Sequence, residues 1–249
     1  MKLTTTSAVV LSAVLATTLA STQAVAAEPD YTLSYNIGAT TDYRFRSIAQ
    51  TSFKPAVQAG ADFAHKSGVY AGVWGSNVNW VKDFAGATDG SLEIDLYGGY
   101  KGELAKGLGF DVGAIAYLYP SNNAATNANT TEVYAALTYG LVTAKYSRSV
   151  TNFVANADST GSQYLEAAAT FDLGNGFSVT PHVGRQLIPN QASPADYTDF
   201  SLTFTKDFGN GLTASVAGVG TDAKDGFYKV GAVDNLGKTG LVVGVKYSF

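Results

Sequence analysis

The last nine residues of the chain constrain its fold more than any other stretch. One face of an extended strand would carry Leu241, Val243, Val245, Tyr247 and Phe249, while Gly244, Lys246 and Ser248 would fall on the other face. This alternation predicts a half-buried β-strand that runs to the final aromatic residue. Such a strand can complete a soluble sheet or a membrane barrel, so the rest of the sequence has to decide between them.

The first 27 residues have the three-part layout of a secretory signal peptide. Lys2 supplies the positive charge, an apolar run follows over residues 8–20, and small residues precede a cleavage site after Ala26 or Ala27. The alternative, a buried N-terminal helix, fits this layout less well. We therefore expect residues 1–27 to be removed and residues 28–249 to form a single domain.

Composition narrows what this exported domain can be. The chain has no cysteine, and no run of about 18 apolar residues follows the signal, so neither a disulfide bond nor a transmembrane helix is predicted. A membrane protein of this kind can cross only as strands. The 15 tyrosines, 13 phenylalanines and 27 glycines suit strands with aromatic girdles. With a formal net charge of −4 and no basic patch, nucleic acid is not an expected partner.

Alternation with a period of two recurs along the whole domain. Residues 31–46 alternate without a break, and all their charges lie on one face. A strand that crosses a membrane needs about 9 to 11 residues, whereas the average strand has about 5 or 6. Eleven further segments follow, approximately residues 53–63, 69–79, 91–101, 108–118, 131–139, 141–149, 162–171, 177–185, 198–207, 212–220 and 240–249.

The connections between these segments alternate between short and long. The short ones are glycine-bearing hairpin turns, as at residues 174–176 and 209–211, whereas the long ones are polar and include residues 221–239. Outer-membrane barrels have short turns on one rim and long loops on the other. We therefore predict an all-β fold, a transmembrane up-and-down antiparallel β-barrel of about twelve strands. A soluble, ligand-binding barrel of the lipocalin kind is the alternative.

In a membrane barrel the polar face of each strand lines the lumen. This rule gives the candidate pore-lining residues Asp42, Arg44, Arg46, Asp62, Glu93, Asp95, Asp111, Glu132, Lys145, Glu166 and Lys246. Arg44 and Arg46, near the outer mouth, would form a transverse field at a constriction with the acidic residues Glu93, Asp95 and Glu132. Alternatively, the same charges would pair into a network that plugs the lumen.

Little in the sequence indicates catalysis, a metal or a cofactor. His65 is expected in a turn and His182 in mid-strand, without an evident set of partners for a metal site or a hydrolytic triad. Four aromatic residues are expected near the outer strand ends, as an interfacial girdle or a platform for stacking sugars: Trp74, Trp80, Tyr117 and Tyr119.

Two stretches resemble known proteins. The terminal strand resembles the C-terminal assembly signal of bacterial outer-membrane barrels. Residues 41–51, Thr-Asp-Tyr-Arg-Phe-Arg-Ser-Ile-Ala-Gln-Thr, resemble the signature of the TorF-type porin family of exported outer-membrane proteins, and the resemblance continues through residues 68–77 and 93–100. Ser47 departs from the glycine expected after the second arginine. The resemblance implies an outer-membrane porin, names no solute and supplies no catalytic residues.

The leading hypothesis is a non-enzymatic channel in the bacterial outer membrane through which small hydrophilic solutes or ions diffuse. Its expected partners are outer-membrane lipid, the outer-membrane assembly machinery and the solutes themselves, and a homo-oligomer is left open. A second hypothesis is a barrel whose lumen is closed by its own charges and whose long loops bind a partner. A third is an outer-membrane hydrolase, which would need active residues at the rim.

Overall fold

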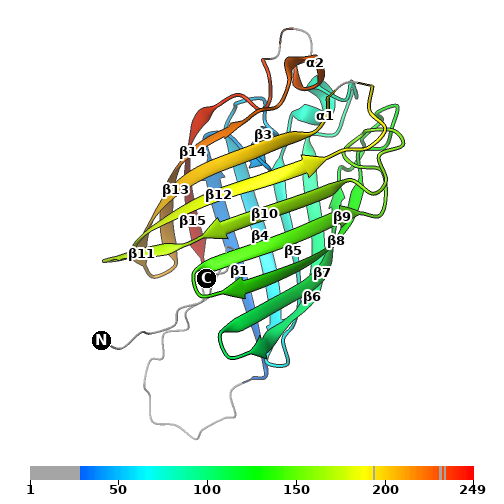
Figure 1. Ribbon diagram of the computed structural model, residues 1–249. Coiled ribbons are helices and arrows are strands. Elements are labelled where there is room, and N and C mark those ends of the chain that lie inside the picture. The colour runs from blue at the N-terminus through cyan, green and yellow to red at the C-terminus, as the bar shows by residue number, and fades with distance from the viewer. Residues whose placement is uncertain (1–28, 193, 230–231, 233) are drawn as a thin grey trace, which may run out of the picture.

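The wall of the molecule is one closed antiparallel β-sheet (Figure 1). The computed structural model describes residues 29–192, 194–229, 232 and 234–249, so the predicted signal peptide lies outside the described residues. The wall segments are β1 (Tyr31–Thr40), β4 (Ala56–His65), β5 (Val69–Asn77), β6 (Leu92–Ala105), β7 (Leu108–Leu118), β8 (Thr130–Tyr139), β9 (Val142–Ser149), β10 (Gln163–Ala169), β11 (Phe171–Gly174), β12 (Phe177–Leu187), β13 (Tyr197–Gly209), β14 (Leu212–Thr221) and β15 (Gly240–Ser248).

The ring closes because every wall strand is paired on both sides. Each strand pairs with its neighbours in the sequence, and β1 pairs with both β4 and β15, which joins the two ends of the chain. The segments β10 and β11 flank Thr170 and both pair with β12, so they form a single interrupted strand. The thirteen segments of the sheet therefore make twelve wall strands. The predicted all-β, twelve-stranded antiparallel barrel is confirmed.

The two ends of the barrel differ. One end carries the tight hairpin turns, in which Asn175 and Asn210 adopt φ of 51° between glycines that also have positive φ. The other end carries the long connections, with the single-turn helices α1 (Trp80–Asp83) and α2 (Asp225–Tyr228) (Figure 1). We call these the turn end and the long-loop end. No helix in the described part of the chain is long and apolar enough to cross a membrane.

The outer face of the wall is apolar. On β15 and at the C-terminus, Leu241, Val243, Val245, Tyr247 and Phe249 all point outward and are 45–75% exposed. Exposed leucine, valine and phenylalanine side chains continue this surface around the other wall strands. A water-soluble barrel would not leave so many large apolar side chains uncovered, whereas lipid would cover them. The role of the terminal strand in assembly stays a prediction.

On the inner face of the wall, tyrosine rings lie over glycines of the neighbouring strand. Tyr97 is paired with Gly72, and a Cβ atom at Gly72 would come within 2.4 Å of that ring. Tyr134 lies over Gly113 in the same way. Because glycine has no side chain, each ring can lie flat along the wall instead of extending across the barrel. Each pair therefore holds its ring against the wall.

The first predicted strand is wrong beyond residue 40. β1 ends at Thr40, and residues 41–55, which we call the plug segment, turn into the barrel and form the small hairpin of β2 (Arg44–Phe45) and β3 (Ile48–Ala49). The two residues of its turn, Arg46 and Ser47, both have positive φ, 49° and 62°, as a tight type I′ hairpin requires. An unbroken polar–apolar alternation does not reveal such a turn.

Candidate channel interior

The plug segment fills the long-loop half of the lumen. Its strands β2 and β3 pair only with each other and form a sheet separate from the wall. Ala49 and Thr51 are completely buried, and Gln50 is 4% exposed. Asp42, Arg44 and Arg46 were predicted on a wall strand, but they reach the lumen on this inserted segment. These three charged residues at the outer mouth therefore belong to the plug segment, which is joined to the wall mainly through side chains and loops.

Arg46 connects the plug segment to strands β8, β10 and β12, which lie on one side of the wall. Its guanidinium donates to Glu132 Oε2 on β8 at 2.6 Å and to Gln186 Oε1 on β12 at 2.7 Å. The guanidinium also lies over the ring of Tyr164 on β10, 4.2 Å from its centroid. The side chains of Arg46 and Glu132 are only 7% and 1% exposed, so this is a dry, charge-assisted contact.

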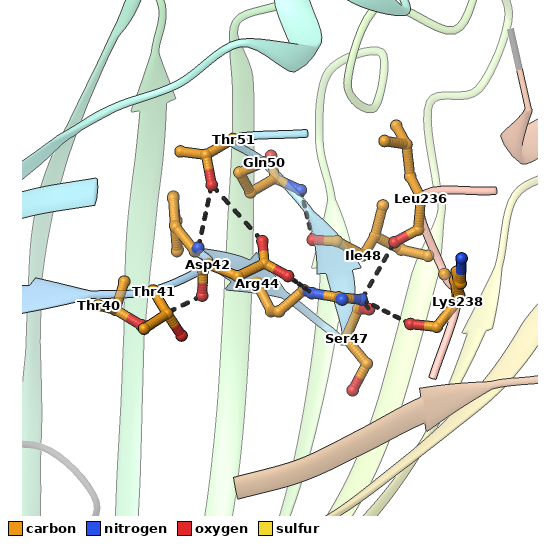
Figure 2. Close-up of polar contacts among 12 residues, drawn as sticks. Thr40, Thr41, Asp42, Arg44, Ser47, Ile48, Gln50, Thr51, Leu236 and Lys238 are labelled. Atoms are coloured by element: carbon orange, nitrogen blue, oxygen red, sulfur yellow. Dashed lines mark hydrogen bonds and ion pairs between the residues drawn. The ribbon is translucent and has the colours of Figure 1, made fainter. Parts of the chain in front are cut away.

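Arg44 connects the plug segment to the last long connection (Figure 2). Its Nε donates to Asp42 Oδ2 at 2.5 Å, and its Nη1 donates to the carbonyl oxygens of Ser47, Leu236 and Lys238 at 3.0–3.2 Å. A backbone hydrogen bond from Ala49 to the Leu236 carbonyl supports the same contact. Both predicted arginines are therefore fully engaged with protein groups.

In the part of the chain that the structure describes, the buried carboxylates Glu93 and Asp95 have no such basic partner. Tyr43 of the plug segment donates its hydroxyl to Glu93 Oε1 at 2.8 Å. Among the described residues, Glu93 Oε2 and Asp95 Oδ1 are buried and accept no hydrogen bond. The sequence predicted a transverse field between the two arginines and Glu93, Asp95 and Glu132. Among the described residues, only Glu132 of these three acids pairs with an arginine, Arg46, whereas Arg44 pairs with Asp42 of the plug segment.

A second polar cluster lies toward the middle of the barrel and is accessible to water. Glu166 accepts from His182 Nε2 at 3.0 Å and lies 3.9 Å from Lys145 Nζ. The exposed fractions of these side chains are 27% for Glu166, 18% for His182 and 33% for Lys145. His182 also faces Asp199, which accepts from Tyr164 at 2.9 Å. The sequence did not predict these partners of His182, because they come from two neighbouring strands.

Near the turn end, carboxylates pair with the tyrosines of the inner wall. Asp62 accepts a hydrogen bond from Tyr97, and Asp111 accepts from Tyr70 at 2.6 Å. Lys246 lies on the inward face of β15, between the exposed residues Val245 and Tyr247. All eleven candidate residues therefore reach the interior, while their role in lining a pore stays a prediction.

Burial perturbs the ionisation of the plug segment and of the loops above it. Desolvation raises the pKa of Asp42, although the guanidinium of Arg44 opposes this shift. Desolvation, followed by the charge of Glu93, raises the pKa of Tyr43 and of Tyr119 well above the usual value for tyrosine. Burial likewise raises the pKa of Tyr228 on α2. These tyrosines stay neutral while the long-loop end is packed.

The four aromatic residues expected at the outer strand ends do not form a girdle. Trp74 packs edge-on against Tyr43 of the plug segment, with ring centroids 5.4 Å apart, and Tyr117 packs against Phe45 at 5.1 Å. Trp80 opens α1 and contacts Tyr119 at 5.0 Å, and both are nearly buried. The interpretation as an interfacial girdle is wrong, because these rings pack inside the barrel and under its loops.

An apolar cavity of about 50 Å³ lies between the plug segment and the long loops. Phe45, Ile48 and Gln50 of the plug segment line one side. The loops supply the remaining lining residues, which are Trp80, Phe84, Phe153, Val154, Asn156, Ile188, Tyr197, Phe227, Tyr228 and Leu236. Within the described residues, no group of three or more histidines, aspartates or glutamates is arranged to hold a metal ion.

Comparison with known proteins places the chain beside bacterial porins in fold. A family model described as "Bacterial protein of unknown function (Gcw_chp)" matches residues 23–249. The solved KdgM porin aligns with a TM-score of 0.56 and 8% identity, over 87% of this chain and 99% of the porin. The NanC porin aligns with a TM-score of 0.57 and 11% identity, over 88% and 99%. No curated protein sequence matches the chain. At these identities the likeness shows the fold alone.

Proposed function

The chain belongs to the bacterial protein family of unknown function Gcw_chp, and we propose that it is a porin-type channel of the outer membrane for small hydrophilic solutes or ions. The turn end would face the periplasm and the long-loop end the exterior. The resemblance of residues 41–51 to the TorF-type porin family supports the same assignment. The proposal includes no covalent chemistry and no cofactor.

The water-accessible charges in the middle of the barrel carry this proposal. Lys145, Glu166 and His182 are 18–33% exposed although they point into the lumen, so water reaches them from inside the barrel. A barrel that served only as a rigid scaffold could fill this space with apolar side chains, since dry charges are costly to bury. A hydrated, charged interior is what a channel for polar solutes needs.

The plug segment would act as the gate of this channel. It blocks the long-loop half of the lumen, yet it forms no ladder with the wall, and its arginine contacts to the wall and the last connection are made by two side chains. Moving the segment would break these side-chain contacts and a few backbone hydrogen bonds, such as the one from Ala49 to the Leu236 carbonyl, which is far less rearrangement than unzipping a wall strand. Conduction would therefore follow a shift of residues 41–55 while the twelve-stranded wall stays intact.

Single-channel recording in a planar bilayer tests the proposal. The refolded parent protein should show rare openings, and the double variant Arg44→Ala plus Arg46→Ala should be open for most of the recording. Arg185→Ala is the matched control, because Arg185 lies next to Gln186 but its side chain is 46% exposed and, within the described part of the chain, it pairs only with Thr198 and Asp222 at the rim. A double variant that is folded, as judged by heat-modifiable gel mobility, and still silent would contradict the channel.

One observation favours a second candidate function, a closed barrel that binds a partner through its long loops. Glu132, Gln186 and Asp199 are at most 1% exposed, so water does not reach these wall side chains that contact the plug segment. This candidate predicts that both the parent and the arginine variant stay silent. The same recordings therefore decide between the two functions.

A further inference from the structure

A histidine lies where the wetted middle of the barrel meets the plug segment. The side chain of His182 on β12 is 18% exposed, so water in the lumen can deliver and remove its second proton. The side chain of Asp199 on β13, which His182 contacts, is only 1% exposed. Histidine is the side chain that ordinarily changes its charge between about pH 5 and 8. A change of pH in the lumen can therefore reach a buried carboxylate through this ring.

The imidazole of His182 lies between two carboxylates from neighbouring strands. Its Nε2 is 3.0 Å from Glu166 Oε2, and its Nδ1 is 3.5 Å from Asp199 Oδ1. A protonated imidazole has two N–H groups and can donate to both acids, whereas a neutral one has a single N–H. Because the contact with Glu166 is shorter, we expect the neutral ring to keep its N–H there. Asp199 would then lose the only ion-pair partner that it has among the described residues.

Asp199 connects this histidine to the tight turn of the plug segment. Its Oδ1 accepts from the hydroxyl of Ser47 at 3.3 Å, and its Oδ2 accepts from the hydroxyl of Tyr164 at 2.9 Å. The ring of Tyr164 in turn lies under the guanidinium of Arg46, 4.2 Å away. Both turn residues, Arg46 and Ser47, thus rest on groups that depend on Asp199. Since a buried carboxylate without its basic partner is costly, a shift of Asp199 would disturb both contacts.

We propose that His182 is a pH sensor, which holds the plug segment closed while its imidazole is protonated and loosens that segment as the pH rises from about 5 to 8. The ionisable side chains around the imidazole come from the elements packed around it, namely Glu166 and Tyr164 on β10, Asp199 on β13 and, farther away, Lys145 on β9 and Arg46 of the plug segment. Lys145 and Arg46 pair with Glu166 and Glu132, so neither replaces the imidazolium beside Asp199. The sensor regulates the gate of the proposed channel, but it acts on plug closure, so a silent bilayer would contradict the channel and not the sensor.

Hydrogen exchange of residues 41–55 at about pH 5 and about pH 8 tests the sensor in the refolded barrel. Each rate is divided by the intrinsic rate of that amide, so that only the opening of the plug segment is compared. In the parent, protection should fall about tenfold between the two pH values, as loss of one charge-assisted hydrogen bond implies. His182→Gln cannot gain a charge and should lose this fall. Protection that is independent of pH in the parent, or an equally large fall in His182→Gln, would overturn the proposal.

Two further variants test the path from the histidine to the plug segment. His65→Gln makes the same change at the only other histidine of the chain, which contacts Ser67 in a turn, and should retain the response of the parent. Asp199→Asn keeps an oxygen that can accept from Ser47 or Tyr164 but carries no charge, so it should respond as weakly as His182→Gln. Heat-modifiable mobility verifies folding of each variant. A response in Asp199→Asn as large as in the parent would refute the assigned path.

Discussion

The long-loop half and the turn-end half of the barrel use charged residues in opposite ways. In the long-loop half, Arg46 and Glu132 are almost completely buried and meet at 2.6 Å. In the middle and the turn-end half, Lys145 and Glu166 are about one-third exposed and lie 3.9 Å apart. The first pair fixes an inserted segment, whereas the second lies on a wetted wall. A charged side chain on the lumen face therefore does not by itself indicate a pore. A buried one can hold the plug segment in place, whereas an exposed one faces solvent.

The largest difference is expected from removing one basic partner in each half. Arg46→Ala leaves Glu132 buried and unpaired, which costs about 3 to 5 kcal/mol for a buried pair. Lys145→Ala breaks a partly exposed pair and should cost less than about 1 kcal/mol. Hydrogen exchange of the amides in residues 41–55 measures the opening of the plug segment. Equal loss of protection in the two variants would contradict the contrast between the halves.

Alkaline pH should open the long-loop half. Tyr43, Tyr119 and Tyr228 have pKa values raised above the usual value of about 10, so the packed state keeps them neutral while the unpacked state ionises. The stability that they provide is complete below pH of about 10 and is lost as the pH rises above it, by about 1.4 kcal/mol per pH unit for each tyrosine. Hydrogen exchange of residues 41–55 as a function of pH checks this.

The variant Tyr43→Phe sharpens the alkaline experiment. It removes one of the three ionisable hydroxyls, so the loss of protection with pH should become shallower. An alkaline transition that is equally steep in Tyr43→Phe, or one that unfolds the wall at the same pH, would show that these tyrosines do not control the long-loop half.

A glycine in the turn-end half should control the width of the lumen. In Gly72→Ala the three atoms nearest to the new Cβ all belong to Tyr97, at 2.4–2.5 Å, so we expect the ring to leave the wall and move into the lumen. The overpacking should cost about 1 to 3 kcal/mol. Combined with Arg44→Ala and Arg46→Ala, this change should lower the unit conductance. An unchanged conductance would mean that the wall tyrosines do not bound the conducting path.

The smallest expected effect concerns the hairpin turn of the plug segment. Ser47→Ala and Ser47→Gly both remove the hydroxyl that contacts Asp199 at 3.3 Å, but only glycine relieves the positive φ of 62°. The free energy needed to open the plug segment should therefore be about 1 kcal/mol higher in Ser47→Gly than in Ser47→Ala. Hydrogen exchange of residues 41–55 measures this difference between the two variants. Greater stability of Ser47→Ala would contradict backbone strain at position 47.

The sequence predicted the wall well because each wall strand obeys a local rule. Alternation placed residues such as Glu132 and Lys145 on the inner face, and glycine-bearing turns located the hairpins. It failed at residues 41–46, since their alternation is the same in a wall strand and in an inserted hairpin. The one hint of a tight turn came from the family resemblance, which leads one to expect a glycine at position 47, where this chain has serine.

The partners of the interior residues were not predictable from the single sequence. His182 meets Glu166 and Asp199 from two neighbouring strands, and Arg46 meets Glu132 on β8 and Gln186 on β12, which β9 and β10 separate. Such contacts depend on strand register and on the entry of the plug segment into the lumen. Trp80 was misplaced for a related reason, because it lies on α1 within a long connection and not at the end of a wall strand.

Cysteine accessibility tests the central claim most directly, because the chain has no cysteine of its own. A membrane-impermeant thiol reagent is applied to Lys145→Cys from each side of the membrane, with and without Arg44→Ala plus Arg46→Ala. We expect labelling from the turn end in both proteins, and labelling from the long-loop end only when the arginines are removed. Rapid labelling from the long-loop end with both arginines present would contradict a plug that seals that half of the barrel.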